Sequence, residues 1–375
     1  MGDEVRGTGG LDPAHDRRPP RRSPWGRRSP YGSGYRDGPP GGDRATYAAL
    51  DLGTNNCRLL VARPTGDSFR VIDAFSRIIR LGEGISASGR ISDPAIERAV
   101  EALAICRDKM KNRGVARARL IATEACRTAV NGGEFQARIT EEVGLDLEII
   151  DRETEAELAA TGCTPLLDPD AEGVILFDIG GGSSELVRLG RSAPCRGPPL
   201  PEIKAWASMP VGVVTLAERH GGHNVTREVY EAMVQEVAGH LAPFVAKNDF
   251  PAVDRMHLLG TSGTVTTIAG VHLELKRYDR RRVDGCWMTD VQATEVVERL
   301  IDMSYEERAA NPCIGSERAD LVLAGCAILE AIRREFPCRR VRVADRGLRE
   351  GMLVQMMRAD GVWGYASGAS GAHAP

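Results

Sequence analysis

The sequence lacks the signals of a disulfide-stabilised, secreted or membrane-spanning protein. Its nine cysteines are scattered and include no CxxC pair, a pattern that favours reduced cytosolic thiols over a disulfide framework or a zinc site. No stretch reaches the roughly 18 consecutive apolar residues of a membrane span, and the N-terminus lacks the apolar core of a secretion signal. We therefore expect a cytoplasmic protein with no membrane contact.

The chain also lacks an excess of either charge. Its net charge is -3, so no overall basic field marks nucleic acid as a partner, and any anion site must be built locally. Hydrophobic residues make up 42% and charged residues 27% of the chain, which is typical of a soluble globular enzyme and excludes collagen-like or wholly disordered classes. A chain of 375 residues is too long to fold around one compact core. Its length therefore predicts two domains separated by a cleft.

Residues 1–44 differ in composition from the rest. They combine proline, glycine and arginine without a periodic apolar face, which predicts a disordered tail. A solubilising extension without a ligand is the simpler interpretation, and weak contact with RNA or a polyanionic substrate is the alternative. That alternative would use Trp25, Tyr31 and the arginines at 17, 18, 21, 22, 27 and 28. We expect residues 364–375 to form a second disordered tail.

The remainder contains one hairpin pattern twice. "ALDLGTNNCRLLVA" and "LFDIGGGSSELV" each give an apolar run, an aspartate, a turn of small residues and a second apolar run. Aligning the copies places Asp51, Gly53, Thr54 and Asn55 on Asp178, Gly180, Gly181 and Gly182. Each copy predicts a strand, a tight turn able to take positive φ, and a returning strand. Neither turn has the GxxxxGKS or GxGxxG spacing of a loop that opens a helix.

The two turns are candidates for phosphate binding. Where side chains are small, backbone N–H groups can approach an anion and form a concave nest. Carboxylates beside a phosphate repel it, so Asp51, Asp178 and Glu185 are better explained as ligands of a hard cation, Mg²⁺ or Mn²⁺. The alternative is a plain hairpin turn in which Asp178 makes an Asx hydrogen bond.

At this point the sequence resembles the exopolyphosphatase and guanosine pentaphosphate phosphohydrolase family. The resemblance spans nearly all of residues 47–357 and depends on ordered blocks that include the two hairpins, "IATEACRTAVNGGEF", "EIIDRETEAELAATG", "SMPVGVVTLAE", "LLGTSGTVTTIAG" and "RVADRGLREGML". It implies an α/β fold of the sugar kinase, actin and chaperone ATPase superfold, with two ribonuclease H-like domains, 45–168 and 169–363, and a central cleft. The chain resembles the family's short form, without an additional helical phosphohydrolase domain.

Local patterns agree with alternating strands and helices. Strands are predicted over 69–81, 118–123, 254–261 and 340–345. Helices are predicted over 132–144, 226–245, 289–303 and 318–336, and from Asp93 with Ser92 as its N-cap and Pro94 in its first turn.

The family resemblance implies that Glu155 is the catalytic carboxylate, which accepts a proton from the attacking water. Acids also favour the first turn of a helix without any catalytic role, and Thr154 with Glu157 fits a capping box. Glu153 is the next candidate base. The chain departs from the common family form at Arg152, Thr154 and Glu157, which affects local geometry and substrate preference more than reaction type.

Several further residues are candidates for phosphate contacts. Arg127 matches a family arginine that reaches the phosphate site, where its planar fork suits phosphoryl oxygens. Ser183 and Ser184 could donate hydroxyl hydrogen bonds to phosphate. Backbone amides at the start of a helix could do the same at Gly260, Thr261, Ser262 and Gly263. These four residues also fit a plain N-capped helix with no ligand. A basic patch at Arg280, Arg281 and Arg282 could line a path for a long polyanion or be a solvated loop. The "HGGH" at 220–223 lacks partner ligands and is interpreted as a loop.

The expected function is metal-dependent release of the terminal phosphate from inorganic polyphosphate by water attack. Guanosine pentaphosphate is the alternative substrate, and a non-catalytic sensor of polyphosphate or guanosine tetraphosphate is a second alternative. A sugar or acyl kinase is less favoured because no acceptor motif is present. A homodimer is compatible with the family.

Overall fold

The computed structural model describes residues 45–191 and 195–363. Both predicted tails lie outside the described residues, and so do the candidate polyanion contacts of the first tail.

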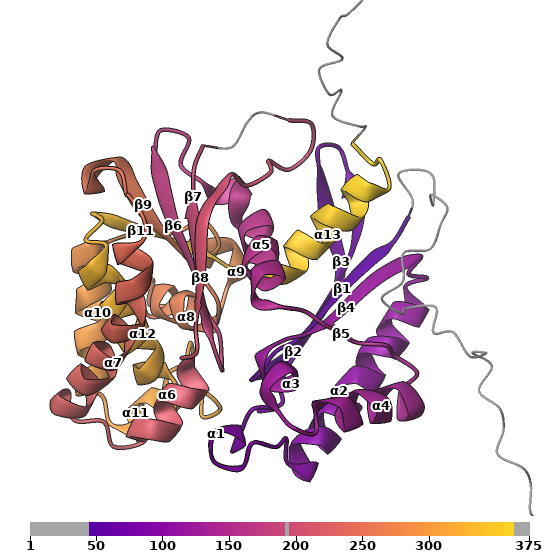
Figure 1. The fold of residues 1–375 in the computed structure, drawn as a ribbon, viewed down its shortest axis with the longest axis horizontal. Coiled ribbons are helices and arrows are strands. Elements are labelled where there is room, and N and C mark those ends of the chain that lie inside the picture. Colours follow the sequence, from indigo (N-terminus) through magenta and orange to yellow (C-terminus); the bar gives the residue numbers. More distant parts are fainter. Residues whose placement is uncertain (1–44, 192–194, 364–375) are drawn as a thin grey trace, which may run out of the picture.

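Two mixed sheets form the two halves of the molecule (Figure 1). The first has the order β3-β2-β1-β4-β5, and the second has the order β10-β11-β9-β6-β7-β8. The two sheets share one arrangement of strands. β1 pairs antiparallel with β2 and parallel with β4, and β6 likewise pairs antiparallel with β7 and parallel with β9. The predicted α/β class with two ribonuclease H-like units is confirmed.

The first sheet contains β1 (Tyr47–Leu52), β2 (Asn56–Thr65), β3 (Ser68–Ile78), β4 (Arg117–Ala122) and β5 (Glu148–Ile149). Its outer face packs on α2 (Asp93–Asn112) and α4 (Gly132–Glu142), through one apolar core. The short helices α1 (Ile85–Ser88) and α3 (Glu124–Thr128) lie in connecting segments. Ser92 occupies the predicted N-cap of α2 but makes no side-chain capping hydrogen bond.

The second sheet contains β6 (Gly173–Ile179), β7 (Ser184–Leu189), β8 (Ile203–Met209), β9 (Met256–Thr261), β10 (Trp287–Thr289) and β11 (Arg340–Ala344). A second core joins it to α6 (Val213–His220), α7 (Arg227–Ala246), α8 (Gly263–His272), α10 (Asp290–Asp302) and α12 (Val322–Glu335). The remaining short helices are α9 (Arg280–Val283) and α11 (Tyr305–Ala310). Within the described residues, none of the helices combines the length and apolar character needed to cross a bilayer.

Two helices lie between the sheets and hold them together. α5 (Arg152–Cys163) packs on β7 and β8, while α13 (Leu348–Ala359) returns to β1 and β2. A Cβ on Gly351 of α13 would lie 2.1 Å from the carbonyl oxygen of Leu158, and one on Gly162 would lie 2.0 Å from that of Gly347. The crossing therefore requires glycine on both helices. α5 thus packs on the second sheet and α13 on the first, so the packing of these helices does not separate the two domains at one position. The domain boundary between residues 168 and 169 stays a prediction.

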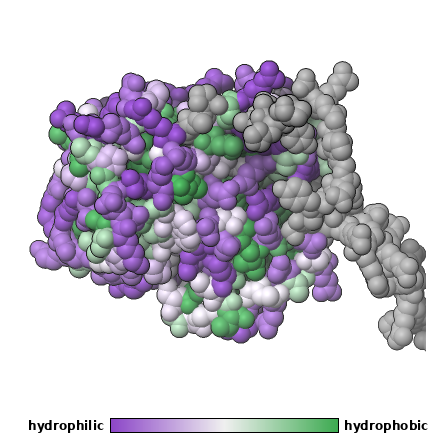
Figure 2. Space-filling view, turned by 45° about the horizontal axis from the view of Figure 1, so that its top comes forward, coloured by the Kyte–Doolittle hydropathy of each residue, from purple (hydrophilic) through white to green (hydrophobic). Residues whose placement is uncertain are grey.

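Polar and charged side chains cover most of one face of the molecule, where hydrophobic residues are scattered in small groups (Figure 2). This distribution is typical of a protein whose apolar side chains are mostly buried in its cores.

Candidate active site

A cavity of about 630 Å³ lies where the tips of the two hairpins meet. Its size falls within the range of small-molecule sites. The turns after β1 and β6 line one part of it, and Glu155 of α5, the start of α8 and the segment after β11 line the rest. Both predicted hairpins therefore contribute to one site.

The glycines in the second turn are needed for close approach between the hairpins. A Cβ on Gly181 would lie 2.9 Å from the Thr54 Cβ, and a Cβ on Gly182 would lie 3.0 Å from the Glu124 Cγ. The expectation of positive φ is wrong, since neither Gly53 nor any glycine of 180–182 is among the positive-φ residues. The second turn has glycine at positions 181 and 182 because Thr54 and Glu124 fill the space that side chains would occupy.

Two backbone amides of the second turn remain available for an anion. Gly53 and Gly180 donate their N–H groups back across their own turns, to Asn56 and Ser183. In the described part of the chain, no acceptor is found for the N–H groups of Gly181 and Gly182, which line the cavity. These two amides fit the predicted nest.

Buried carboxylates surround the turns, and burial raises their pKa values. Burial raises the pKa of Asp178 to about 6, with Asp51 adding to the shift and Arg58 opposing it. Burial and then Asp178 raise the pKa of Glu185 to about 7, although the hydroxyls of Ser183 and Ser208 both donate to its Oε1, at 2.7 and 2.9 Å. Burial likewise raises the pKa of Asp51. The three groups predicted as metal ligands therefore occupy one electrostatically strained neighbourhood.

The residues fit a cation that takes few protein ligands. Within residues 45–191 and 195–363, no group of three His, Cys, Asp or Glu side chains is arranged to hold a metal by itself. Mg²⁺ commonly uses one or two carboxylates and completes its shell with water and substrate phosphates, so a site at Asp178 with Glu185 or Asp51 is compatible with this arrangement. His220 instead contacts Glu236, and the His223 ring stacks on Tyr305.

Glu155 is the one acid of its helix start that faces the cavity. It is only 8% exposed and lines the site, whereas Glu153 and Glu157 are exposed on α5 and do not. Burial, followed by the charge of Glu185, raises its pKa well above the ordinary value. The capping-box interpretation is wrong, because Asp151 is the N-cap and its Oδ1 accepts the Thr154 N–H at 2.8 Å.

Arg127 holds Glu155 from behind. One Nη of Arg127 lies 3.0 Å from Oε2 of Glu155 and 2.6 Å from Oε2 of Glu124. Arg152, the departure from the common family form, lies 2.7 Å from the other oxygen of Glu124. Arg127 does not line the cavity in this structure; its guanidinium orients the two carboxylates that do.

The remaining candidates fall into two groups. Thr54, Asn55, Ser183, Thr261, Ser262, Gly263 and Arg280 line the cavity. Ser262 has a φ of 98° and a buried hydroxyl that lacks a hydrogen-bond partner among the described residues. By contrast, the Ser184 hydroxyl is fully buried and donates to the Val211 carbonyl, and Gly260 faces the Phe177 ring. Arg281 and Arg282 are exposed and do not line the cavity.

Sequence reasoning did not single out several cavity residues. Glu124, Arg58, Arg318 and Arg349 all line the site. Arg58 could have been found from the hairpin itself, since it lies opposite Asp51 in the register. Glu124 precedes Arg127 by one helical turn, a spacing that favours an ion pair. No local pattern indicates Arg318 or Arg349, which reach the cavity through the packing of α12 and α13.

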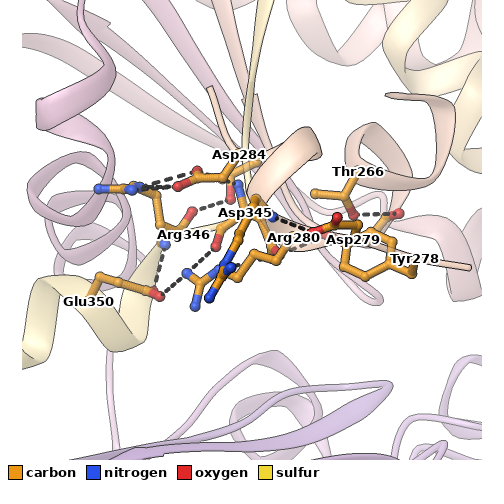
Figure 3. A network of polar contacts seen from close by, with 12 residues as sticks. Thr266, Tyr278, Asp279, Arg280, Asp284, Asp345, Arg346 and Glu350 are labelled. Atoms are coloured by element: carbon orange, nitrogen blue, oxygen red, sulfur yellow. Dashed lines mark hydrogen bonds and ion pairs between the residues drawn. The ribbon is translucent and has the colours of Figure 1, made fainter. Parts of the chain in front are cut away.

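A polar network joins the end of β11 to α9 and α13 at the edge of the site (Figure 3). An Nη of Arg280 lies 2.8 Å from Oε1 of Glu350, and the Tyr278 hydroxyl donates to Oδ2 of Asp345 at 2.7 Å. Arg346 pairs with Asp284, and its carbonyl accepts from Thr261 at 2.6 Å. The network fixes α9, which begins at Arg280, against the C-terminal helix α13.

Known proteins resemble this chain in sequence and in fold. The model of the Ppx/GppA phosphatase family matches residues 60–360. Exopolyphosphatase 2 of Mycobacterium tuberculosis is 30% identical over 324 residues, which cover 82% of this chain and 98% of that protein. The crystal structure of an exopolyphosphatase-like protein is similar, with a TM-score of 0.75, 28% identity and coverage of 85% of this chain and 99% of that chain.

The crystal structure of the Aquifex aeolicus member of the Ppx/GppA family is similar too, with a TM-score of 0.68, 27% identity and coverage of 84% of this chain and 98% of that chain. The architecture is therefore the two-domain fold of the sugar kinase and actin superfold. With a family match over most of its length and a relative at this identity and coverage, the chain belongs to the Ppx/GppA phosphatase family.

Proposed function

We propose that this phosphatase removes the terminal phosphate of inorganic polyphosphate by direct attack of water. The observation that carries the proposal is Glu155, a buried carboxylate of raised pKa that faces the free amides of the hairpin turn across one cavity. A general base needs reach to the attacking water and a pKa near the working pH. The similarity to an exopolyphosphatase supports the substrate class.

In this reaction the chain's own residues have separate roles. Glu155 accepts a proton from water as the water oxygen bonds to the terminal phosphorus and the bridging P–O bond breaks. The shortened polyphosphate leaves with that bridging oxygen. The Gly181 and Gly182 amides, with Arg58, stabilise charge on the transferring phosphoryl group. Arg127 keeps Glu155 in place, and in this arrangement it acts on the substrate only through that carboxylate.

Asp178, Glu185 and Asp51 would hold Mg²⁺, or Mn²⁺ in its place. Such a cation would neutralise phosphate oxygens and act as a Lewis acid. The Ser183 and Ser208 hydroxyls hold Glu185 in one orientation toward this position.

Guanosine pentaphosphate is the second candidate substrate, because the same residues can act on its terminal phosphate. The Tyr278 ring, which is 40% exposed and lines the cavity, favours it, because a purine base can stack on such a ring. A homodimer and a cytoplasmic location stay predictions.

The test is phosphate release by the purified full-length protein, with polyphosphate and guanosine pentaphosphate assayed side by side at equal concentrations of terminal phosphate. We expect turnover with Mg²⁺, loss with a chelator and recovery when the cation is restored. Substrate binding without phosphate release from either compound would contradict an enzyme and favour the non-catalytic sensor.

A further inference from the structure

Arg80 links the two halves of the molecule. It follows β3 of the first half, and its guanidinium makes a two-bond ion pair with Asp320 of the second half, Nη1 to Oδ2 at 2.9 Å and Nη2 to Oδ1 at 3.1 Å. The same Nη2 donates to the Glu317 carbonyl at 3.0 Å. Nearby, the Gly84 N–H donates to Oε1 of Glu218 at 2.8 Å, where α1 lies beside α6, below α5 and α13 in the view of Figure 1. A two-bond pair fixes orientation as well as distance.

The backbone of Arg80 is also held. Its φ is 46°, in the left-handed region that residues other than glycine rarely adopt, and such a conformation persists only where the surrounding contacts enforce it. Its N–H donates to the Asn55 carbonyl at 3.1 Å, and its carbonyl accepts from an Nη of Arg98 at 3.4 Å. The Gly82 N–H donates to the Thr54 carbonyl at 2.8 Å. The backbone of Arg80 is therefore anchored to the first hairpin turn.

Arg318 lies between the two residues that the Arg80 guanidinium contacts. The turn of residues 315–321 precedes α12 and brings the Arg318 guanidinium to the cavity. There its Nη1 would lie 3.6 Å from a Cβ built on Gly263, at the start of α8. Among the residues that the structure describes, this guanidinium has no hydrogen-bond or ion-pair partner. Its place therefore depends on the backbone of the turn, which Arg80 holds on both sides of it.

We propose that Arg80 is a positioning residue that acts across the two halves of the molecule and holds Arg318 at the cavity. Arg80 does not line the cavity, so its effect reaches a ligand only through the residues that it holds. Arg318 pairs with a phosphate of the substrate, and this step rests on the proposed function. The positioning itself rests on the contacts of Arg80 and on the unpaired guanidinium between them.

The test is a double-mutant cycle of Arg80→Ala and Arg318→Ala, with KM and kcat measured for phosphate release from inorganic tripolyphosphate. A hydrogen bond to a charged group contributes about tenfold in affinity, so Arg80→Ala should raise KM about tenfold and largely keep kcat. In the Arg318→Ala background, Arg80→Ala should change KM by less than about twofold, because the residue through which it acts is already removed. An unchanged KM in Arg80→Ala, or effects of the two substitutions that multiply, would overturn the proposal.

Three further variants supply a second route, a conservative change and a control. Asp320→Asn removes the charge that Arg80 pairs with and should raise KM by about threefold or more, even if Arg80→Ala does not fold. Arg80→Lys keeps the charge but not the two-bond geometry, so its KM should lie between those of wild type and Arg80→Ala. Arg334 makes a similar pair with Glu231, at 2.7 and 3.0 Å, between α12 and α7 within the second half. Arg334→Ala should leave KM unchanged, and a rise equal to that of Arg80→Ala would contradict a specific role for Arg80.

Binding separates this proposal from the proposed function. Should the protein release no phosphate from any substrate, calorimetric titration of inorganic tripolyphosphate with Mg²⁺ into the same variants gives Kd in place of KM. Binding that Arg80→Ala weakens about tenfold in the wild-type background, and not in the Arg318→Ala background, would then uphold the positioning role while the hydrolase proposal fails. Losses of affinity that multiply, unchanged affinity in Arg80→Ala, or a wild-type protein that does not bind tripolyphosphate would overturn it.

Discussion

The contact between the hairpins predicts that a single added carbon atom at Gly181 will impair the enzyme. In Gly181→Ala the new Cβ would lie 2.9 Å from the Thr54 Cβ, 3.2 Å from its Cγ2 and 3.3 Å from the Asn55 amide nitrogen. Carbon atoms in van der Waals contact are about 3.5–4.0 Å apart, so the hairpins must separate by about 0.5–1 Å. The residues that move apart carry the amides and the carboxylates of the site.

Overpacking of this kind typically costs about 1–3 kcal/mol in stability. Misplacement of reacting groups by about 1 Å can cost about 10²-fold in rate. We therefore expect Gly181→Ala to lower kcat/KM for polyphosphate about 10²-fold while the protein remains folded. Initial rates of phosphate release and thermal unfolding with and without substrate measure the two effects.

Gly239 provides the matched control. It is exposed in the middle of α7, and a Cβ built on it has no neighbour within 4 Å. Gly239→Ala should leave turnover unchanged and raise stability by up to about 1 kcal/mol, because alanine loses less backbone entropy in a helix. A Gly181→Ala enzyme with wild-type kcat/KM would refute the argument that close approach of the hairpins forms the site.

Three further predictions concern stability, pH and substrate length. Gly351→Leu should destabilise the protein by about 1–3 kcal/mol or more in urea unfolding, since a side chain there meets the α5 backbone; an unchanged midpoint would contradict the tight helix crossing. The folded-state pKa values of Asp178 and Glu185, about 6 and 7, lie above their unfolded values, so the metal-free protein should lose stability as pH rises from about 4 to 7, and Mg²⁺ should offset the loss above pH 7. Thermal melts with chelator or Mg²⁺ across this range check the sign, and a metal-free protein that gains stability over it would contradict the assignment. Arg281→Ala combined with Arg282→Ala should raise the KM for long polyphosphate and flatten its salt dependence while sparing tripolyphosphate; equal effects on both substrates would remove these arginines from any path for the chain.

The hairpins could be predicted from the sequence because their pattern is local and occurs twice. Strand, turn and strand are encoded by apolar runs around Asp51 and Asp178, and the register that brings Glu185 opposite Asp178 follows from the turn length. The reason for the glycines could not be predicted. Gly181 is required by Thr54, which is distant in sequence and reaches it only once both domains have folded.

The burial and orientation of the polar side chains could not be predicted from the sequence either. Glu155 carries the ordinary sequence signature of a solvated acid at a helix start, and its burial follows from the packing of α5 between the sheets. Ser184 looked like a phosphate ligand beside Ser183, yet strand alternation turns it inward to the Val211 carbonyl. Arg318 reaches the cavity from the turn before α12 and Arg349 from the first turn of α13, and no local sequence pattern marks either of them. Tertiary contacts, which no single segment encodes, determine which polar residues face the site.

The most direct test of the central claim is single-turnover phosphate release by Glu155→Gln, with Glu153→Gln as its exposed neighbour on the same helix. Glutamine keeps the shape of the side chain and removes its ability to accept a proton. We predict a loss of about 10²- to 10⁴-fold in the rate of phosphate release for Glu155→Gln, substrate affinity within a few-fold of wild type, and near-normal release for Glu153→Gln. A Glu155→Gln enzyme that releases phosphate at close to the wild-type rate would contradict the account.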